Sequence, residues 1–198
     1  EPTPFPLAQQ QPCRLVDAAQ NWVTSEGTGD NPFLLWLSFP EPHNPYQAPE
    51  PYYSMFPPES LPPTLSDKTA LAGKSYKYQY NRARLEDAYP PFDEVMPRAR
   101  SNYFGMLRLI DDQVKRFVEF LDAQGLRDDT IVVFTSDHGE MFGAHSRIAK
   151  ATFYEESVRT PFLMQWGDRL PAGANDVCLN TPDIMPTLLG MMDLPIPD

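Results

Sequence analysis

The chain has 198 residues, of which 41% are hydrophobic and 22% charged, and these values are typical of a folded globular protein rather than a disordered one. Its formal net charge of -11 argues against a nucleic-acid-binding protein, which normally carries a basic stripe. No apolar run approaches the roughly 20 residues that span a bilayer. We therefore expect neither nucleic acid nor a membrane as a partner, and the oligomeric state is left open.

Two cysteines, Cys13 and Cys178, lie far apart in the sequence and form no C-x-x-C pair. This spacing excludes a zinc ribbon and a thioredoxin-like motif. We expect both cysteines to be small buried residues, with a disulfide between them as the alternative.

The first part of the chain predicts a helix, a strand and a long loop. Apolar residues at helical spacing predict an amphipathic helix over 14–25. The run FLLWLSF at 33–39 predicts a buried parallel strand. Residues 40–63 are too rich in proline for a helix or a central strand. Their tyrosines favour an ordered loop over the surface, with His43 at its beginning.

The rest of the chain alternates helices and short strands. Residues 66–88 predict one or two short helices, and 98–124 a long amphipathic helix. Short runs at 131–134 and 161–166 predict strands, the first of them fully buried. Thr181, followed by proline and an acid, is typical of a helix N-cap. The order of elements fits part of a three-layer α/β/α sandwich with a mainly parallel sheet.

Reactive side chains follow the strand over 131–134 directly. Asp137 and His138 lie at its carboxyl end, where ligands bind in open parallel sheets. A turn there can point a carboxylate and an imidazole at one cation. The alternative is an aspartate that only caps the turn. Two ligands cannot complete a metal site, so further oxygen ligands must come from elsewhere.

The three histidines, His43, His138 and His145, all fall in loops just after predicted strands. Scattered surface histidines are not expected to gather there, which favours a functional role for the set. Lys150, at the far side of a glycine-containing loop, is a point charge suited to binding a tetrahedral oxyanion. Taken alone, each histidine is equally well explained as a surface or turn residue, and a lone lysine is ordinarily a solvated surface group.

Several segments of the sequence together resemble a known protein family. SDHGEMFGAHSRIAKATFYEESVRTPFLMQW at 136–166 resembles the C-terminal signature region of the sulfatases, in the alkaline phosphatase-like superfamily. There a strand ends in Asp-His or Asp-Asn, and a Gly-rich loop, a lysine and a Y-E-E-S-x-R-x-P segment follow. FLLWLSFPEPHNPYQAP resembles the family's strand and P-H-x-P loop, and TPDIMPTLLGMM its later helix. The resemblance implies the α/β/α alkaline phosphatase-like sandwich, here incomplete.

The resemblance also implies a role for each matching residue. Asp137 and His138 would bind a catalytic divalent metal, usually Ca²⁺, with Mn²⁺ or Mg²⁺ as alternatives. His43 and Lys150 would be catalytic and would contact the sulfate oxygens. His43 would also protonate the leaving alcohol, because sulfate ester cleavage builds charge on that oxygen.

Two further residues in the same loop, His145 and Arg147, are candidates for substrate binding, although Ala144 stands where many relatives have Asp. The implied substrate is a small-molecule or carbohydrate sulfate ester, and the aromatic residues of 40–63 are compatible with stacking on a sugar ring. The resemblance favours a periplasmic or secreted location, but the chain shows no signal peptide and its location is left open.

The family's nucleophile is missing from the sequence. Sulfatases use a cysteine converted to formylglycine, or a serine, in a C/S-x-P-x-R motif near their N-terminus. Neither Cys13 nor Cys178 is in such a motif, and Ser60 begins a similar segment without the arginine. The family's early Asp-Asp metal pair is also absent. We therefore expect 1–198 to be part of a sulfatase catalytic domain, a sulfuric ester hydrolase, and to be inactive alone.

Two other functions remain open. A phosphodiesterase or phosphonate monoester hydrolase of the same superfamily also uses an Asp-His pair, and comparing sulfate and phosphate ester rates would distinguish it. A non-catalytic binding module derived from the fold is the alternative from another class. Intact C/S-x-P-x-R and Asp-Asp motifs upstream would exclude that alternative.

Overall fold

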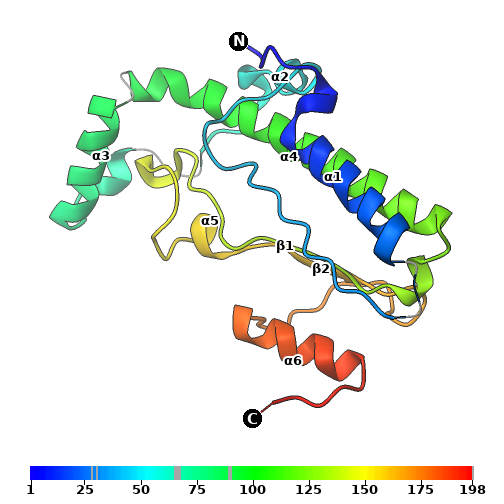
Figure 1. Ribbon diagram of the computed structural model, residues 1–198. Helices are drawn as coiled ribbons and strands as arrows, with labels where there is room; N and C mark the ends of the chain where they lie inside the picture. The colour runs from blue at the N-terminus through cyan, green and yellow to red at the C-terminus, as the bar shows by residue number, and fades with distance from the viewer. Residues whose placement is uncertain (28, 30, 65–67, 89–90, 198) are drawn as a thin grey trace. The chain divides into compact units, whose positions relative to one another are not determined.

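The computed structural model describes residues 1–27, 29, 31–64, 68–88 and 91–197, which form two compact units, Glu1–Gly167 and Asp168–Asp198 (Figure 1). In the described part of the chain, no helix is both long enough and apolar enough to cross a membrane. Single turns of 3₁₀-helix occur at Leu7–Gln9, Pro58–Ser60, Lys68–Leu71, Arg127–Asp129 and Ala144–Ser146.

The first unit is built on two packed helices. α1 spans Gln11–Trp22 and continues as a π-helical turn over Val23–Gly27, so the predicted helix at 14–25 is confirmed. It packs against α4, Phe92–Ala123 (Figure 1). Across this contact, the Arg116 side chain donates to the carbonyl of Cys13 at 2.9 Å.

α4 begins at Phe92, earlier than the start at 98 that the sequence predicts. Asp93 and Glu94 lie in its first turn, where carboxylates are stabilised by the helix dipole. Pro97 lies inside the helix. Proline usually marks a helix end, and for that reason the first turns of α4 were missed.

The proline-rich segment 40–63 is an ordered loop, as predicted, and lies along α4. It contains one short helix, α2, Tyr52–Met55, so the prediction that it forms no helix is wrong. Four side chains of α4 donate hydrogen bonds to its backbone carbonyls: Asn102 to Tyr46 (2.9 Å), Arg98 to Tyr53 (3.4 Å), Ser101 to Phe56 (2.5 Å) and Arg100 to Pro62 (2.7 Å). These bonds satisfy carbonyls that a loop without regular structure cannot pair internally.

The two strands that the structure describes are β1, Val132–Thr135, and β2, Phe162–Gln165. Both predicted positions are confirmed. The strands pair antiparallel, with Val132 opposite Gln165, so this pair does not provide the parallel pairing that the sequence predicts. β1 is half-buried rather than fully buried.

The apolar run 33–39 is not a strand among the described residues, and its prediction as a buried strand is wrong. Its exposure alternates along the run, with Leu34 and Trp36 84% and 83% exposed. Alternation is the pattern of an extended chain with one covered face. The apolar run therefore correctly indicates an extended chain. It does not reveal whether a neighbouring strand is hydrogen-bonded to it, and among the described residues none is.

Between α2 and α4 the chain forms α3, Tyr76–Ala88, after the turn Lys68–Leu71. The prediction of short helices over 66–88 is therefore confirmed for its described part, while 66–67 lie outside it. A last short helix of this unit, α5, spans Glu155–Val158 and leads into β2.

The second unit contains α6, Thr181–Met191. Its N-cap is Asn180 and not Thr181, because the Asn180 side chain and Asp183 form a capping box with the first backbone N–H groups. Cys178 in this unit is exposed and Cys13 is buried, and both are free thiols. The expectation that both cysteines are buried is therefore wrong for Cys178.

We predict that Gly105→Ala destabilises the first unit. A Cβ on Gly105 would lie 3.0 Å from the carbonyl carbon of Tyr52 and closer still to its oxygen. Overpacking of this kind costs about 1–3 kcal/mol, which outweighs the gain of up to about 1 kcal/mol from the better helix former. Thermal unfolding should show a lower midpoint. Gly29→Ala, which meets nothing closer than 3.8 Å, is the control, and equal midpoints would contradict the packing.

We also predict different reactivities for the two thiols. Burial raises the pKa of Cys13, so less of it is thiolate at a given pH, and only the thiolate reacts. Cys178 should therefore react with a disulfide reagent at pH 8 much faster than Cys13. The Cys178→Ser protein should stay unreactive until it is unfolded. Rapid labelling of the folded Cys178→Ser protein would contradict the burial of Cys13.

Candidate functional site

His43 and Lys150, which are 107 positions apart, meet in the structure. Nζ of Lys150 lies 2.9 Å from Nε2 of His43. Nδ1 of His43 lies 3.0 Å from the carbonyl oxygen of Asn44. A carbonyl can only accept, so Nδ1 carries the proton and Nε2 accepts from the lysine ammonium. The two residues thus form one contiguous polar group.

Three aromatic side chains hold the segments that carry this pair. Tyr46 follows His43 in the loop, Tyr103 lies on α4, and Phe142 lies in the loop before Lys150. The ring of Phe142 is 4.1 Å from that of Tyr103 and 4.8 Å from that of Tyr46, and the two tyrosine rings are 6.2 Å apart. We call these three side chains the aromatic trio. It joins the three segments and so places His43 beside Lys150.

Glu140 fastens the loop that leads to Lys150. Its carboxylate accepts from the backbone N–H of Phe142 at 3.3 Å and from that of Ala149. The N–H of Met141 donates to the carbonyl of Ala149 at 2.9 Å. Together with burial, this carboxylate raises the pKa of Tyr103 to about 12. The loop is therefore closed on itself immediately before the lysine.

This loop is conformationally strained. Phe142, His145, Ser146, Ala149 and Ala151 all have positive φ angles, from 41° to 69°. Such angles are uncommon for residues with a Cβ and cost of order 1–3 kcal/mol each unless the surroundings enforce them. Strained residues cluster at functional sites, and here they surround Lys150.

Asp137 and His138 follow β1 directly, as the sequence predicts. Asp137 is exposed, and its Oδ2 lies 3.6 Å from Nε2 of His138. Nδ1 of His138 lies 2.8 Å from the carbonyl of Gly139, so it carries the proton and leaves Nε2 as an acceptor. Gly139 packs against α5, where a Cβ would come 3.0 Å from the carbonyl carbon of Glu156.

The Asp137–His138 pair fits one side of a metal site. Two donors 3.6 Å apart can both bind a cation at the about 2.3–2.6 Å typical of Ca²⁺. Ca²⁺ takes about 6–8 ligands, and the described residues contain no group of three or more His, Cys, Asp or Glu side chains that could hold a metal. The pair alone could therefore provide two ligands of such a site, and the other ligands would have to come from elsewhere.

His145 and Arg147, the other predicted site residues, lie in the same loop but contact aromatic side chains and not the His43–Lys150 pair. The His145 ring stacks on that of Tyr154 at 4.0 Å. The Arg147 guanidinium lies over the ring of Tyr78 at 4.8 Å. The structure thus connects this loop to α3, which the sequence did not predict.

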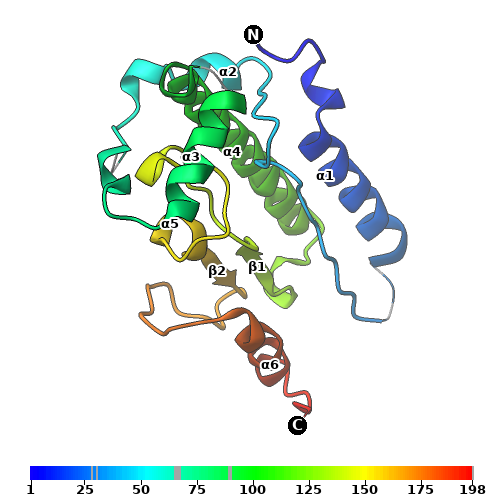
Figure 2. The ribbon, with the colours of Figure 1, turned by 90° about the vertical axis from the view of Figure 1, so that its left-hand side faces the viewer.

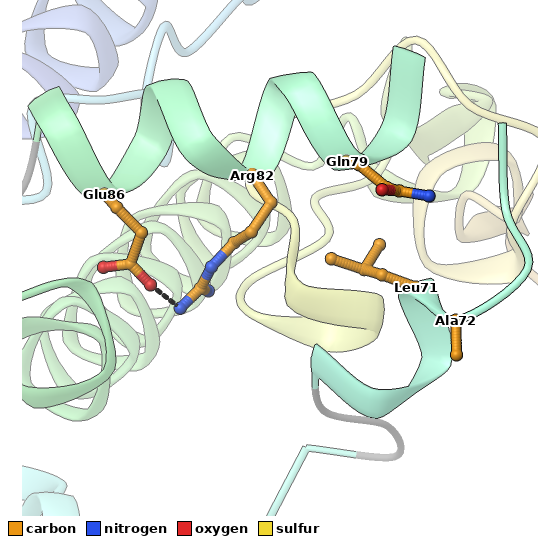
Figure 3. A pocket seen from close by; sticks show the side chains of 5 residues that line it. All are labelled: Leu71, Ala72, Gln79, Arg82 and Glu86. Atoms are coloured by element: carbon orange, nitrogen blue, oxygen red, sulfur yellow. Dashed lines mark hydrogen bonds and ion pairs between the residues drawn. The ribbon is translucent and has the colours of Figure 1, made fainter. Parts of the chain in front are cut away.

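A hollow of about 410 Å³ is lined by Leu71 and Ala72 and by three residues of α3, namely Gln79, Arg82 and Glu86 (Figure 3). Arg82 is buried and pairs with Glu86 and, at 3.0 Å, with Asp93. Two carboxylates offset its charge, so the hollow is a poor site for an anion. None of the predicted site residues lines it.

Sequence reasoning missed the residues that position the site, namely Glu140, Tyr103 and Phe142. Glu140 stands beside the Asp-His pair, where a carboxylate suggests a metal ligand and not an acceptor for backbone N–H groups. Tyr103 lies on the apolar stripe of an amphipathic helix, and that pattern predicts only packing of the helix. No local pattern marks Phe142, because its partners come from two distant segments.

We predict that Phe142→Ala loosens the loop. The variant removes the ring that contacts both tyrosines, and truncating a core phenylalanine costs up to about 3–5 kcal/mol, less for this half-buried one. Amide hydrogen exchange at Met141 and Ala149 should accelerate. Phe153→Ala, on the same loop but with its ring 97% exposed, is the control. Equal exchange in both variants would contradict the positioning role of the trio.

Both the sequence and the fold are similar to those of known proteins. The Sulfatase family model matches residues 6–194. An arylsulfatase from Clostridium perfringens is 34% identical over 191 residues, covering 90% of this chain and 39% of the relative. An ulvan-active sulfatase from Formosa agariphila is 32% identical over 192 residues, covering 94% of this chain and 34% of the relative. The chain thus spans about a third of the length of these relatives.

Among solved structures, a phosphonate monoester hydrolase from Silicibacter pomeroyi matches with a TM-score of 0.84 and 25% identity. The match covers 99% of this chain and 40% of that one. The predicted α/β alkaline phosphatase-like fold class is therefore confirmed, in an incomplete form with a small two-stranded sheet.

Proposed function

Because the chain belongs to the sulfatase family, we propose that it contributes the sulfate-binding pair and part of the metal site of a sulfuric ester hydrolase. The observation that carries the proposal is the 2.9 Å contact between Nζ of Lys150 and Nε2 of His43. Two groups this close can both reach one sulfate group, one as a cation and one as a proton carrier.

Each residue of the pair has a separate task. The Lys150 ammonium would bind the sulfuryl oxygens and stabilise the charge on them. His43 would act as the general acid: the ester O–S bond breaks, and the leaving oxygen takes the proton from Nε2. The sulfuryl group passes to a nucleophile of the C/S-x-P-x-R type, which the 198 residues do not contain.

The observed hydrogen bond indicates what must change when substrate binds. Nε2 of His43 accepts from Lys150, so it holds no proton to donate. As general acid it must gain one, while the ammonium turns from the imidazole to a sulfate oxygen. The sulfate anion favours both changes, because it attracts the cation and stabilises a protonated imidazole.

Asp137 and His138 would hold the divalent cation, for which we propose Ca²⁺, with Mn²⁺ or Mg²⁺ as alternatives. The support is the 3.6 Å separation of their donor atoms and the chemistry of an oxygen and an imidazole nitrogen on one turn. When bound, the cation would polarise a sulfate oxygen as a Lewis acid.

The substrate class that we propose is a carbohydrate sulfate ester. The ulvan-active relative from Formosa agariphila shares 32% of its aligned residues with this chain. Phe153, three positions after Lys150, is 97% exposed and can stack on a sugar ring, since aromatic faces pack well against apolar surfaces.

Phosphonate monoester hydrolysis is the second candidate, and one observation favours it. The solved phosphonate monoester hydrolase matches 99% of the chain with a TM-score of 0.84. A phosphonate monoester is also a tetrahedral anion, so Lys150 and His43 would contact it in the same way. The affinities of the chain for phenyl sulfate and for a phenyl phosphonate monoester distinguish the two functions.

We predict that the 198-residue chain binds 4-nitrophenyl sulfate but does not turn it over, because it contains no C/S-x-P-x-R nucleophile. Isothermal titration measures the binding, and release of 4-nitrophenol measures turnover. Sustained release of 4-nitrophenol by the purified chain would show that another residue of the chain acts as nucleophile.

We further predict that Lys150→Gln and His43→Gln each weaken this binding about 10- to 100-fold. A hydrogen bond to a charged group contributes about 1.5–3 kcal/mol, and 1.4 kcal/mol is tenfold in affinity. Lys77→Gln removes the same charge from an exposed position of α3 and is the control. An unchanged affinity in the Lys150→Gln protein would refute the proposed sulfate-binding role.

A further inference from the structure

Two tyrosines beside the Lys150 loop each carry a cation over their ring. Tyr78 of α3 and Tyr154 meet edge to face, with ring centres 6.3 Å apart. The guanidinium of Arg147 lies 4.8 Å above the ring of Tyr78, and Nζ of Lys74 lies 5.9 Å from that of Tyr154. Two positive charges thus share one aromatic pair, in a chain whose net charge is -11.

This cluster adjoins the segment that carries Lys150. The rings of His145 and Tyr154 stack at 4.0 Å and 10°, and they join the two ends of the loop in which Lys150 lies. Figures 1 and 2 both show α3 next to this loop. The carboxylate of Glu156 lies 3.8 Å from Nε2 of His145.

Arg147 lacks the partners that a buried guanidinium normally has. It is only 8% exposed, and its Nε and Nη1 are buried without a hydrogen-bond partner among the described residues. Arg82 provides the comparison. It also lies over an aromatic ring, that of Phe92 at 4.1 Å, but it pairs with Glu86 and Asp93.

An anion would supply the partner that Arg147 lacks. Arginine cannot lose its proton in a protein, and a buried charge is stable only when it is paired. Its planar fork of N–H groups matches a carboxylate or a sulfate with two parallel hydrogen bonds. Lys74, which is exposed, is in no ion pair among the described residues and adds a second cation at the same place.

We propose that Arg147 and Lys74 form a second anion subsite beside Lys150, which binds a carboxylate or sulfate of the substrate other than the sulfate that is cleaved. The inference rests on the proposed function and narrows its substrate class to esters with at least two anionic groups. Tyr78 and Tyr154 form the apolar floor of the subsite and hold the two cations in place.

Isothermal titration with matched ligands tests this subsite in the 198-residue chain. The probes are phenyl sulfate and its derivatives with a carboxylate or a second sulfate at position 3 or 4. We expect at least one dianion to bind ten times more tightly than phenyl sulfate. The anion that the subsite prefers is the substituent, carboxylate or second sulfate, that increases the affinity more. Arg147→Gln should remove the gain, Lys74→Gln should reduce it severalfold, and Lys77→Gln should retain it.

Several outcomes would overturn the subsite. One is equal affinity of the chain for all the ligands. Another is an Arg147→Gln variant that loses phenyl sulfate and dianion binding equally, because Arg147 would then only support the loop. If Arg147→Gln does not fold, the exposed Lys74→Gln decides: retention of the full gain overturns the proposal. Lys150→Gln distinguishes a failure of the proposed function from a failure of the subsite. If this variant binds every ligand with unchanged affinity, Lys150 does not bind the sulfate. The subsite would still stand if the dianions keep a gain in affinity that depends on Arg147.

Discussion

The contact of Phe142 with Tyr46 and Tyr103 is the interaction on which the candidate site depends. These three rings, 4.1–6.2 Å apart, come from three segments that share no backbone pairing. His43 lies three residues before Tyr46 in its loop. Lys150 follows Phe142 in a loop that Glu140 closes. The contact of Phe142 with Tyr46 links the loop of His43 directly to the loop of Lys150. An aromatic cluster of this kind orders long segments because each ring buries a large area for few rotatable bonds.

The site combines this packing with strain. Residues with positive φ surround Lys150, and a free loop would relax them. The carboxylate of Glu140 holds the loop from inside through two backbone N–H groups. The stacking of His145 on Tyr154 joins the two ends of the same loop. The strain is thus offset by hydrogen bonds and ring contacts on both sides. A rigid loop of this kind keeps a cation at a fixed position, which is what recognition of a tetrahedral anion requires.

Much of the fold follows from local sequence patterns. The helix at 14–25 and the strands near 131–134 and 161–166 have periodic or compact apolar runs that tertiary contacts do not override. The prediction of a strand at 33–39 was wrong because apolar content indicates an extended chain but not a hydrogen-bonded strand beside it. The predicted start of α4 was wrong because proline usually ends a helix, whereas Pro97 lies inside a helix that packing stabilises. Candidate ligands were visible as Asp137 and His138 beside a strand. The residues that position Lys150 were not, since their contacts join distant segments.

We propose above all that His43 and Lys150 act on one oxyanion as a unit. The most direct test is a titration of the chain with sodium sulfate, followed by the ¹⁵N signals of the His43 ring and the Lys150 ammonium. We predict that both signals shift with a single dissociation constant and that Nε2 of His43 changes from an acceptor to a protonated nitrogen. A shift of the Lys150 signal alone, or two different dissociation constants, would contradict it.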